Sequence, residues 1–246
     1  MPSPDACAGR PTVFHVTHWK AGSQWVRSVL KHAAPERFVQ PRPAGPDPLG
    51  GPVVPGAVYS PVYAPLSRFR AAVPASLDQR TFVVIRDPRD TLVSWYFSLL
   101  HSHGEDDPTV LESREELRQL SKSEGMAVLA GKHMMEVSWI QREWITAGAR
   151  VFRYEDFRAN QQETYRQLFE FCELPVWAFW RRSIVRRHSF IRRTWWRLGR
   201  ESVTSHLRKG AVGDWRNHFD DDLKRLFKQT HGETLALAGY ERDDAW

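Results

Sequence analysis

The sequence predicts an α/β fold in which a mainly parallel central sheet is flanked by helices. Three short runs rich in β-branched and aromatic residues are typical of buried strands: residues 12–17 (TVFHVT), 81–85 (TFVVI) and 150–154 (RVFRY). Segments whose apolar residues recur at helical spacing separate these runs. Strands that alternate with helices indicate a parallel sheet.

The length of 246 residues suits one large domain, and we predict a single domain over 1–246 with a flexible tail at 1–11. No run of 18 apolar residues occurs, so no transmembrane helix is expected, and the N-terminus lacks the layout of a signal peptide. Cys7 and Cys172 are the only cysteines. This count disfavours a disulfide framework and makes a reducing cytoplasm the expected location.

The first strand is followed by apolar residues at helical spacing, which predict a helix over 23–32. Residues 35–56 are crowded with proline and glycine, and we predict a long irregular loop there. After the strand at 81–85, a helix is expected over 88–100, with Asp87 as N-cap and Pro88 at the first helical position. Further helices are predicted at 110–121, 126–147 and 160–172, and the remainder is expected to be helical with a loop near 207–217.

The formal net charge of +6 is concentrated in one segment. Residues 181–209 contain ten Lys or Arg and one acidic residue, Glu201, so this segment carries +9 and the rest of the chain about −3. So strong a local charge indicates either an anionic partner (nucleic acid, an acidic membrane surface or a polyphosphate-like ligand) or a solvated helix face.

The turn after the first predicted strand has the composition of an anion site. Residues 20–24 (KAGSQ) fall at the carboxyl end of that strand and the start of a helix, where N–H groups and the helix dipole favour anions. Gly22 permits close backbone approach, Lys20 adds a charge, and Trp25 is large enough to stack on a base. The glycine-rich Walker sequence is absent, and an ordinary β-to-α turn is the alternative.

Two later stretches have a similar character. Arg86 lies at the end of the strand 81–85, and Ser94 follows two helical turns later on the same face, pointing back towards the strand end. Residues 207–219 (LRKGAVGDWRNHF) place two cations beside a glycine, with a second glycine three residues on. Each stretch is a candidate anion site; the alternative for the first is a core strand that ends in a surface arginine.

Taken together, these stretches resemble the sulfotransferases of the cytosolic type that depend on 3′-phosphoadenosine-5′-phosphosulfate (PAPS). Residues 18–25 (HWKAGSQW) are similar to the family's 5′-phosphosulfate loop, 86–94 (RDPRDTLVS) to its 3′-phosphate segment, and 208–215 (RKGAVGDW) to its closing motif. Residues 154–157 (YEDF) resemble a segment whose tyrosine touches adenine. Residues 188–190 (HSF) resemble the adenine-binding T-S-F turn, with histidine replacing threonine.

The resemblance implies a P-loop-like nucleotide-binding architecture and transfer of a sulfuryl group from PAPS to a hydroxyl or amine of a small-molecule acceptor, without a metal. No nucleic-acid or membrane partner is expected. Lys20 would stabilise charge on the departing phosphate oxygen. The cofactor-binding residues so implied are Lys20, Ala21, Gly22, Ser23, Gln24, Trp25, Arg86, Ser94, Tyr154, His188, Ser189, Phe190, Arg208, Lys209 and Gly210.

The family's catalytic histidine has no counterpart in residues 58–65 (VYSPVYAP), where Tyr63 takes its place. A tyrosine with a pKa near 10 is a poor base at neutral pH unless cations lower that pKa, but it could orient the acceptor. His101 and His103 are the other candidates for the base. The family's dimerisation segment is not recognisable in 220–230, so the sequence does not indicate whether the protein is a monomer or an oligomer.

Two other classes of protein share some of these features. A nucleotide kinase is disfavoured because the G-x-x-x-x-G-K-[ST] sequence and a magnesium-binding acid at a strand end are missing. A nucleic-acid-binding protein would use residues 181–209, where Trp195 and Trp196 lie among cations. We favour a flap over cofactor or acceptor for residues 191–206, because the closing motif adjoins them.

Overall fold

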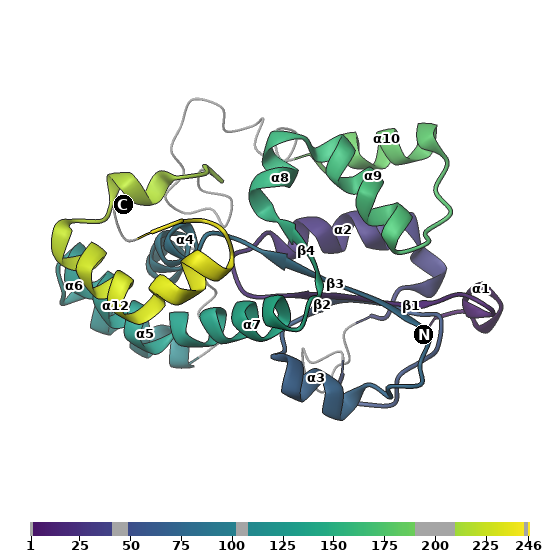
Figure 1. Cartoon of the computed structure of the whole chain (residues 1–246), viewed down its shortest axis with the longest axis horizontal. Coiled ribbons are helices and arrows are strands. Elements are labelled where there is room, and N and C mark those ends of the chain that lie inside the picture. The colour runs from purple at the N-terminus through teal and green to yellow at the C-terminus, as the bar shows by residue number, and fades with distance from the viewer. Residues whose placement is uncertain (1, 41–48, 102–107, 190–209, 244–245) are drawn as a thin grey trace. The chain divides into compact units, whose positions relative to one another are not determined.

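The computed structural model describes residues 2–40, 49–101, 108–189, 210–243 and 246 (Figure 1). The chain divides into two compact units. We call residues 1–85 and 143–193 the sheet unit, and residues 86–142 and 194–246 the helical unit. The sheet unit holds the strands β1 (Thr12–Thr17), β2 (Val58–Val62), β3 (Gln79–Ile85) and β4 (Arg150–Arg153), together with α1 (Pro4–Cys7), α2 (Ser23–Ala33), η1 (Pro35–Arg37), α3 (Leu66–Ala72), α8 (Tyr154–Ala159), α9 (Gln161–Phe171) and α10 (Ala178–Arg187).

The four strands form one sheet in the order β2-β1-β3-β4, and every pair is parallel. The predicted α/β fold with a parallel sheet is therefore confirmed. Strand β2 was not predicted, because Pro61 interrupts its short apolar run VYSPV. Proline lacks a backbone N–H and is tolerated at the edge of a sheet, which is where β2 lies.

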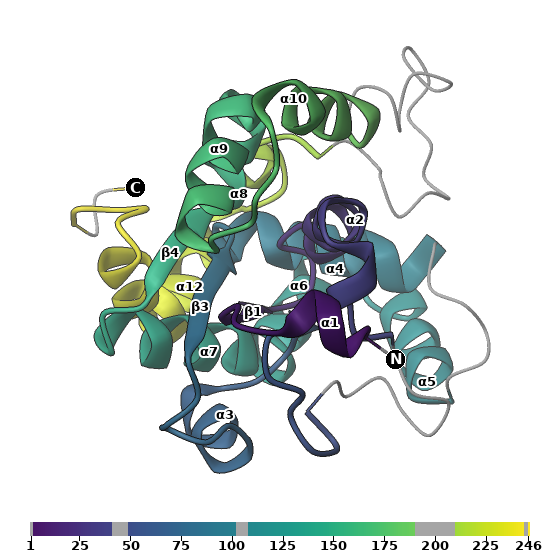
Figure 2. The same ribbon diagram turned by 90° about the vertical axis from the view of Figure 1, so that its right-hand side faces the viewer.

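Alternate residues of β1 face two different layers. Val13 belongs to the core cluster shared with α2, α8 and α9, which cover one face of the sheet (Figures 1 and 2). Phe14 points to the other face, where its ring packs edge-on against Phe69 of α3 at 5.0 Å. Both β1 residues are fully buried, and each such side chain contributes about 1.5–3 kcal/mol to folding.

The segments predicted as a flexible tail (1–11) and an irregular loop (35–56) contain short helices that contact each other. Cys7 at the end of α1 is buried and lies against Gly56. Arg37 of η1 is also buried and donates hydrogen bonds to the carbonyls of Gly56 and Pro11, both at 2.7 Å. Both cysteines, Cys7 and Cys172, are free and buried.

The helical unit contains α4 (Pro88–His101), α5 (Pro108–Arg118), α6 (Lys122–Lys132), η3 (Asp214–Asn217) and α12 (Asp221–Leu237), and α7 (Met134–Thr146) runs from it into the sheet unit. The prediction of one helix over 126–147 was wrong. Ser121 and Glu124 form a capping box that starts α6 at Lys122, and α6 ends at His133, its C-cap.

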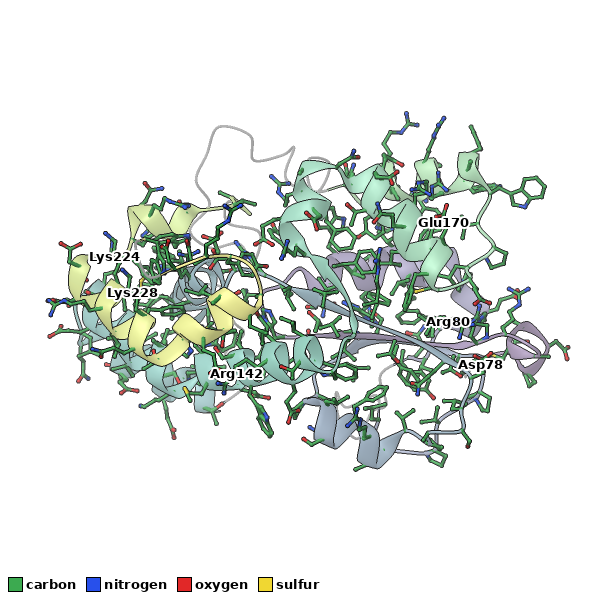
Figure 3. The ribbon with its side chains drawn as sticks, in the orientation of Figure 1. Asp78, Arg80, Arg142, Glu170, Lys224 and Lys228 are labelled. Carbon is green, nitrogen blue, oxygen red and sulfur yellow. The ribbon has the colours of Figure 1, made fainter. Side chains whose placement is uncertain are left out.

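Most ion pairs of the described residues lie on the surface. Arg80 pairs with Asp78 at 2.9 Å at the start of β3, and Arg142 pairs with Glu233 at 2.6 Å in the helical unit; Asp78, Arg80 and Arg142 are labelled in Figure 3. Such exposed pairs contribute little to stability. Within the described part of the chain, no helix is both long enough and apolar enough to cross a bilayer.

Candidate active site

The turn between β1 and α2 has an unusual backbone at two positions. Lys20 has φ +65° and Gly22 has φ +82°, so both are left-handed. Gly22 is the N-cap of α2, and its carbonyl accepts the N–H groups of Trp25 (2.9 Å) and Val26 (3.1 Å). No side chain caps this helix start. The turn therefore places Lys20 two residues before an uncapped helix N-terminus, an arrangement that favours an anion.

Two features favour glycine at position 22: its positive φ and its close approach to Tyr154. A Cβ atom added to it would lie 2.9 Å from Cδ2 of Tyr154, the first residue of α8. Tyr154 is buried and its ring lies edge-on to Trp25 at 6.3 Å. The structure thus brings together three of the predicted cofactor residues, Gly22, Trp25 and Tyr154, at the carboxyl ends of β1 and β4.

Gly22→Ala is expected to weaken binding of adenosine 3′,5′-bisphosphate (PAP) at least tenfold and to destabilise the protein by about 1–3 kcal/mol, from the positive φ and the contact with Tyr154. Gly148→Ala is the matched control, because Gly148 has φ +72° but nothing within 4 Å of the added Cβ. The Gly148→Ala variant therefore measures the cost of placing alanine at a positive φ without any steric contact. If calorimetric titration and denaturant unfolding gave the same PAP affinity and the same stability for both variants, the close packing of Gly22 against Tyr154 would have no role in binding.

Trp25 is a core residue as well as a predicted base contact. Only 6% of it is exposed, and its ring lies about 6 Å from those of Phe157 and Tyr165. Of its neighbours in the loop, Ala21 and Ser23 are buried and Gln24 is exposed. The side chain of Trp25 therefore anchors the start of α2 to α8 and α9.

The predicted adenine turn adjoins α2 as well. His188 is the C-cap of α10, and its Nε2 lies 3.1 Å from Nδ1 of His32 on α2. The next residue, Ser189, is buried, and its N–H donates to the carbonyl of Arg186. His32 was not predicted from the sequence, since nothing distinguishes it from the other polar residues of α2. Phe190 lies outside the described residues.

Tyr63 follows β2 and lies next to the β1–α2 turn, because β1 and β2 are parallel neighbours. Its hydroxyl donates to Oγ of Ser23 at 2.8 Å, and its ring lies 6.3 Å from Trp19. Burial raises the pKa of Tyr63, although the hydrogen bonds with Ser23 and Gln24 and the charge of Arg27 oppose this. Tyr63 is therefore a hydrogen-bond donor at neutral pH and an unfavourable base.

In the helical unit, Arg86 comes directly after β3 and is 6% exposed. Its backbone carbonyl accepts a hydrogen bond from the buried Gln141 at 2.9 Å, and its Nη2 donates to the carbonyl of Ala211 at 3.2 Å. Arg86 and Ala211 of the closing motif, 125 residues apart in sequence, are thus in contact. Gln141 was missed, because a buried glutamine within a helix gives no sequence signal.

Asp90 connects the same two stretches. Its carboxylate accepts the backbone N–H of Gly213 at 2.7 Å and that of Trp215 at 3.0 Å. Burial raises the pKa of Asp90, while Arg86 and these two N–H groups act in the opposite direction. Asp90, in the first turn of α4, therefore fixes the described part of the closing motif onto α4.

Arg89, the other cation of the 86–94 stretch, is buried and bound by side chains of the protein itself. It is 1% exposed, and it pairs with Asp87 at 2.8 Å and with Glu241 at 2.5 Å. Its guanidinium lies 4.0 Å from the ring centroid of Trp215 and 4.4 Å from that of Trp246. The Arg89 N–H also donates to Asp87 at 2.9 Å, as the predicted N-cap requires.

The remaining predicted residues are dispersed. Ser94 is half-buried on α4, and Gly210 has φ +55° at the start of the described part of the closing motif. His101 is exposed at the end of α4, where its ring stacks on Phe97 at 6.4 Å. His103, Arg208 and Lys209 lie outside the described residues, so their roles stay predictions.

The family profile described as "Sulfotransferase domain" matches residues 70–239. This range is more than half of the chain, and the protein belongs to the sulfotransferase domain family. The matched range includes Arg86, Asp90, Tyr154 and the closing motif. It begins after the β1–α2 turn, so the assignment of that turn rests on its own residues and geometry.

Curated relatives and solved structures agree with this membership. Sulfotransferase 6B1 of Danio rerio is 26% identical over 166 residues (64% of this chain, 52% of the relative), and a 3-alpha-hydroxysteroid sulfotransferase of Cavia porcellus is 26% identical over 167 residues (62% and 54%). The chain matches about half the length of these curated relatives.

Two solved structures share the fold. Mouse sulfotransferase SULT7A1 complexed with PAP has a TM-score of 0.64 at 17% identity, covering 94% of this chain and 88% of that one. Retinol dehydratase in complex with androsterone and the inactive cofactor PAP has a TM-score of 0.56 at 14% identity, covering 93% and 82%. The predicted fold class is that of the sulfotransferases.

Proposed function

We propose that the protein transfers a sulfuryl group from PAPS to a hydroxyl or amine of a small-molecule acceptor. The observation that supports this most strongly is the contact between the Arg86–Ser94 stretch and the closing motif, made through Arg86 to Ala211 and through Asp90 to Gly213 and Trp215. The resemblance assigns both stretches to one nucleotide. The helical unit brings their described parts together although more than 120 residues separate them.

The sheet unit, taken by itself, also has the features of an anion site. The β1–α2 turn offers a lysine, an uncapped helix start and the hydroxyl of Ser23. Gly22 leaves no side chain between the turn and Tyr154. We assign the 5′-phosphosulfate to Lys20, Ala21, Gly22, Ser23 and Gln24. Adenine is assigned to Trp25, Tyr154 and the turn at 188–190.

The 3′-phosphate is assigned to Arg86 and Ser94, with Arg208, Lys209 and Gly210 closing over the nucleotide. Arginine suits this role because its planar guanidinium binds phosphate oxygens in a fork. Arg89 is excluded from the role since its guanidinium is already bound by two carboxylates and two indole rings.

PAPS supplies an activated sulfuryl group whose sulfur–oxygen bond to phosphate breaks as a new one to the acceptor oxygen forms. Lys20 would neutralise charge that develops on the departing phosphate oxygen, which is the largest contribution a fixed cation can make to such a transfer. Tyr63 would orient groups at the β1–β2 edge by donating its proton. His101 and His103 remain the candidates to receive the proton of the acceptor.

Tyr63→Phe is expected to lower kcat by less than about tenfold and to leave the pH profile of kcat unchanged between about pH 6 and 9, because the raised pKa keeps Tyr63 protonated there. Removal of a general base lowers kcat by about 10²–10⁴-fold. Initial rates of His101→Ala and His103→Ala, measured beside it, identify the base. A loss of 10²-fold or more in Tyr63→Phe alone would assign the base to Tyr63.

The reaction is tested by following PAP formation from PAPS with and without a panel of acceptors. Androsterone and retinol, named in neighbouring structures, and simple phenols are suitable first members. We expect PAP formation that depends on an acceptor and proceeds in the presence of a metal chelator. Phosphoryl transfer from ATP with no turnover of PAPS would instead support the kinase alternative.

A further inference from the structure

Helix α10 begins with three large apolar side chains in solvent. Trp177, the N-cap, is 81% exposed, Phe179 is 78% exposed and Trp180 is 59% exposed. These are the three most exposed large apolar residues among those the structure describes. Contiguous exposed aromatic residues mark interaction surfaces, since burying them in a partner recovers free energy that solvent exposure costs.

The second half of the same helix is cationic. Arg182, Arg186 and Arg187 are exposed, and none of them forms an ion pair with another described residue. Residues 175–189 contain four arginines, including the half-buried Arg181, and no acid. The surface is thus both apolar and positively charged.

The helix separates these two properties along its axis. Ile184 and Val185 are buried against α2 and α9, which lie beneath α10 (Figure 2). Phe179, Arg182 and Arg186 recur at helical spacing on the outward side. The aromatic residues occupy the amino-terminal end of this side and the free guanidinium groups its carboxyl-terminal end.

We propose that the outward side of α10, formed by Trp177, Phe179, Trp180, Arg182, Arg186 and Arg187, binds the surface of an anionic phospholipid bilayer. Tryptophan and phenylalanine enter the boundary between headgroups and acyl chains, and arginine binds the lipid phosphates. This is a surface contact and not a membrane span. It replaces the expectation, drawn from the family resemblance, that the protein has no membrane partner, and it does not depend on the proposed sulfuryl transfer.

The dimensions suit this partner. Phe179 and Arg186 are seven residues apart, about 10 Å along a helix axis at 1.5 Å per residue. Apolar faces of interfacial helices reach about 5–10 Å below the headgroups. A helix that tilts its amino-terminal end inwards therefore puts the aromatic residues at the acyl boundary while the arginines stay among the phosphates.

A nucleic acid is the competing anion. Single-stranded nucleic acids are bound where aromatic residues for stacking alternate with cations that follow the backbone. On α10 the aromatic residues form one group and the exposed arginines another, so stacked bases would lie away from most of the positive charge. Trp177 and Phe179 are also 81% and 78% exposed, more than side chains that line a groove would be.

The test is co-sedimentation with vesicles of phosphatidylcholine containing roughly one-third phosphatidylserine, compared with phosphatidylcholine alone. We expect binding to the anionic vesicles that weakens as NaCl rises from about 0.1 to 0.5 M. Replacing Arg182, Arg186 and Arg187 with Gln should lower the partition coefficient by about 100-fold, at about fivefold per charge. Replacing the three aromatic residues with Ala should lower it by a similar factor.

Control variants change exposed residues elsewhere on the protein. An Arg70, Arg118 and Arg225→Gln variant removes the same charge, and a Leu111, Met135 and Trp139→Ala variant removes apolar residues that are 41–49% exposed. Both should bind as the unmodified protein does. Absence of vesicle binding, equal loss in the controls, or salt-sensitive binding to a generic DNA duplex without binding to vesicles would overturn the proposal.

Discussion

Lys20→Ala is expected to lower kcat by about 10²–10³-fold while changing the Kd for PAPS by less than about tenfold. The lysine is proposed to act on charge that develops on the phosphate oxygen as the sulfuryl group leaves, so bound PAPS, in which that charge has not yet developed, gains little from it. Backbone strain does not confuse the comparison, because alanine at φ +65° has the same conformational cost as lysine. Steady-state kinetics and calorimetric titration with PAPS in the absence of an acceptor measure the two effects separately.

Lys31→Ala is the matched control, since Lys31 is an exposed lysine at the other end of α2. It should leave both kcat and Kd unchanged within about twofold. Equal losses of turnover and of affinity in Lys20→Ala would contradict a role in the transition state and would make Lys20 an ordinary phosphate ligand.

Arg89→Met is expected to lower the free energy of unfolding by about 3–5 kcal/mol, because it leaves the buried carboxylate of Asp87 and the half-buried one of Glu241 without their cation. Arg89 lies within the 86–94 stretch but was not among the predicted cofactor residues. Its guanidinium instead holds Asp87, Glu241, Trp215 and Trp246, and so connects the start of α4 to the closing motif and the C-terminus. Urea unfolding at pH 7 measures the loss.

Arg142→Met supplies the comparison in the same unit. Arg142 and Glu233 form a pair whose side chains are 40% and 77% exposed, and breaking it should cost less than about 1 kcal/mol. If Arg89→Met were no more destabilising than Arg142→Met, the buried pairs of Arg89 would not have the structural role assigned to them.

The secondary structure that was predicted well has strong local signals. The strands β1 and β3 consist of β-branched and aromatic residues, and the start of α4 is specified by Asp87 and Pro88. Strand β2 was missed because its pattern is short and contains Pro61. The start of α6 was misplaced because it is set by the capping box Ser121–Glu124, and the residue between α6 and α7, His133, is neither a glycine nor a proline that would mark a helix end.

The sequence predicted the separate stretches of the site but could not predict the contacts between them. Nothing local to Asp90 indicates that its carboxylate binds the backbone of Gly213 and Trp215. Nor does the sequence around Arg89 distinguish a buried ion pair from a phosphate ligand. Such distinctions depend on which distant segments pack against a side chain, and that follows from the tertiary fold.

The central claim is that this chain recognises a nucleotide with a 3′-phosphate. Calorimetric titration with PAP and with adenosine 5′-monophosphate tests it most directly. We expect one site that binds PAP at least about 100-fold more tightly than adenosine 5′-monophosphate, since charge-assisted hydrogen bonds contribute about 1.5–3 kcal/mol each. Arg86→Gln should remove most of that preference. Absence of PAP binding at micromolar concentration, or equal affinity for the two nucleotides, would contradict the account.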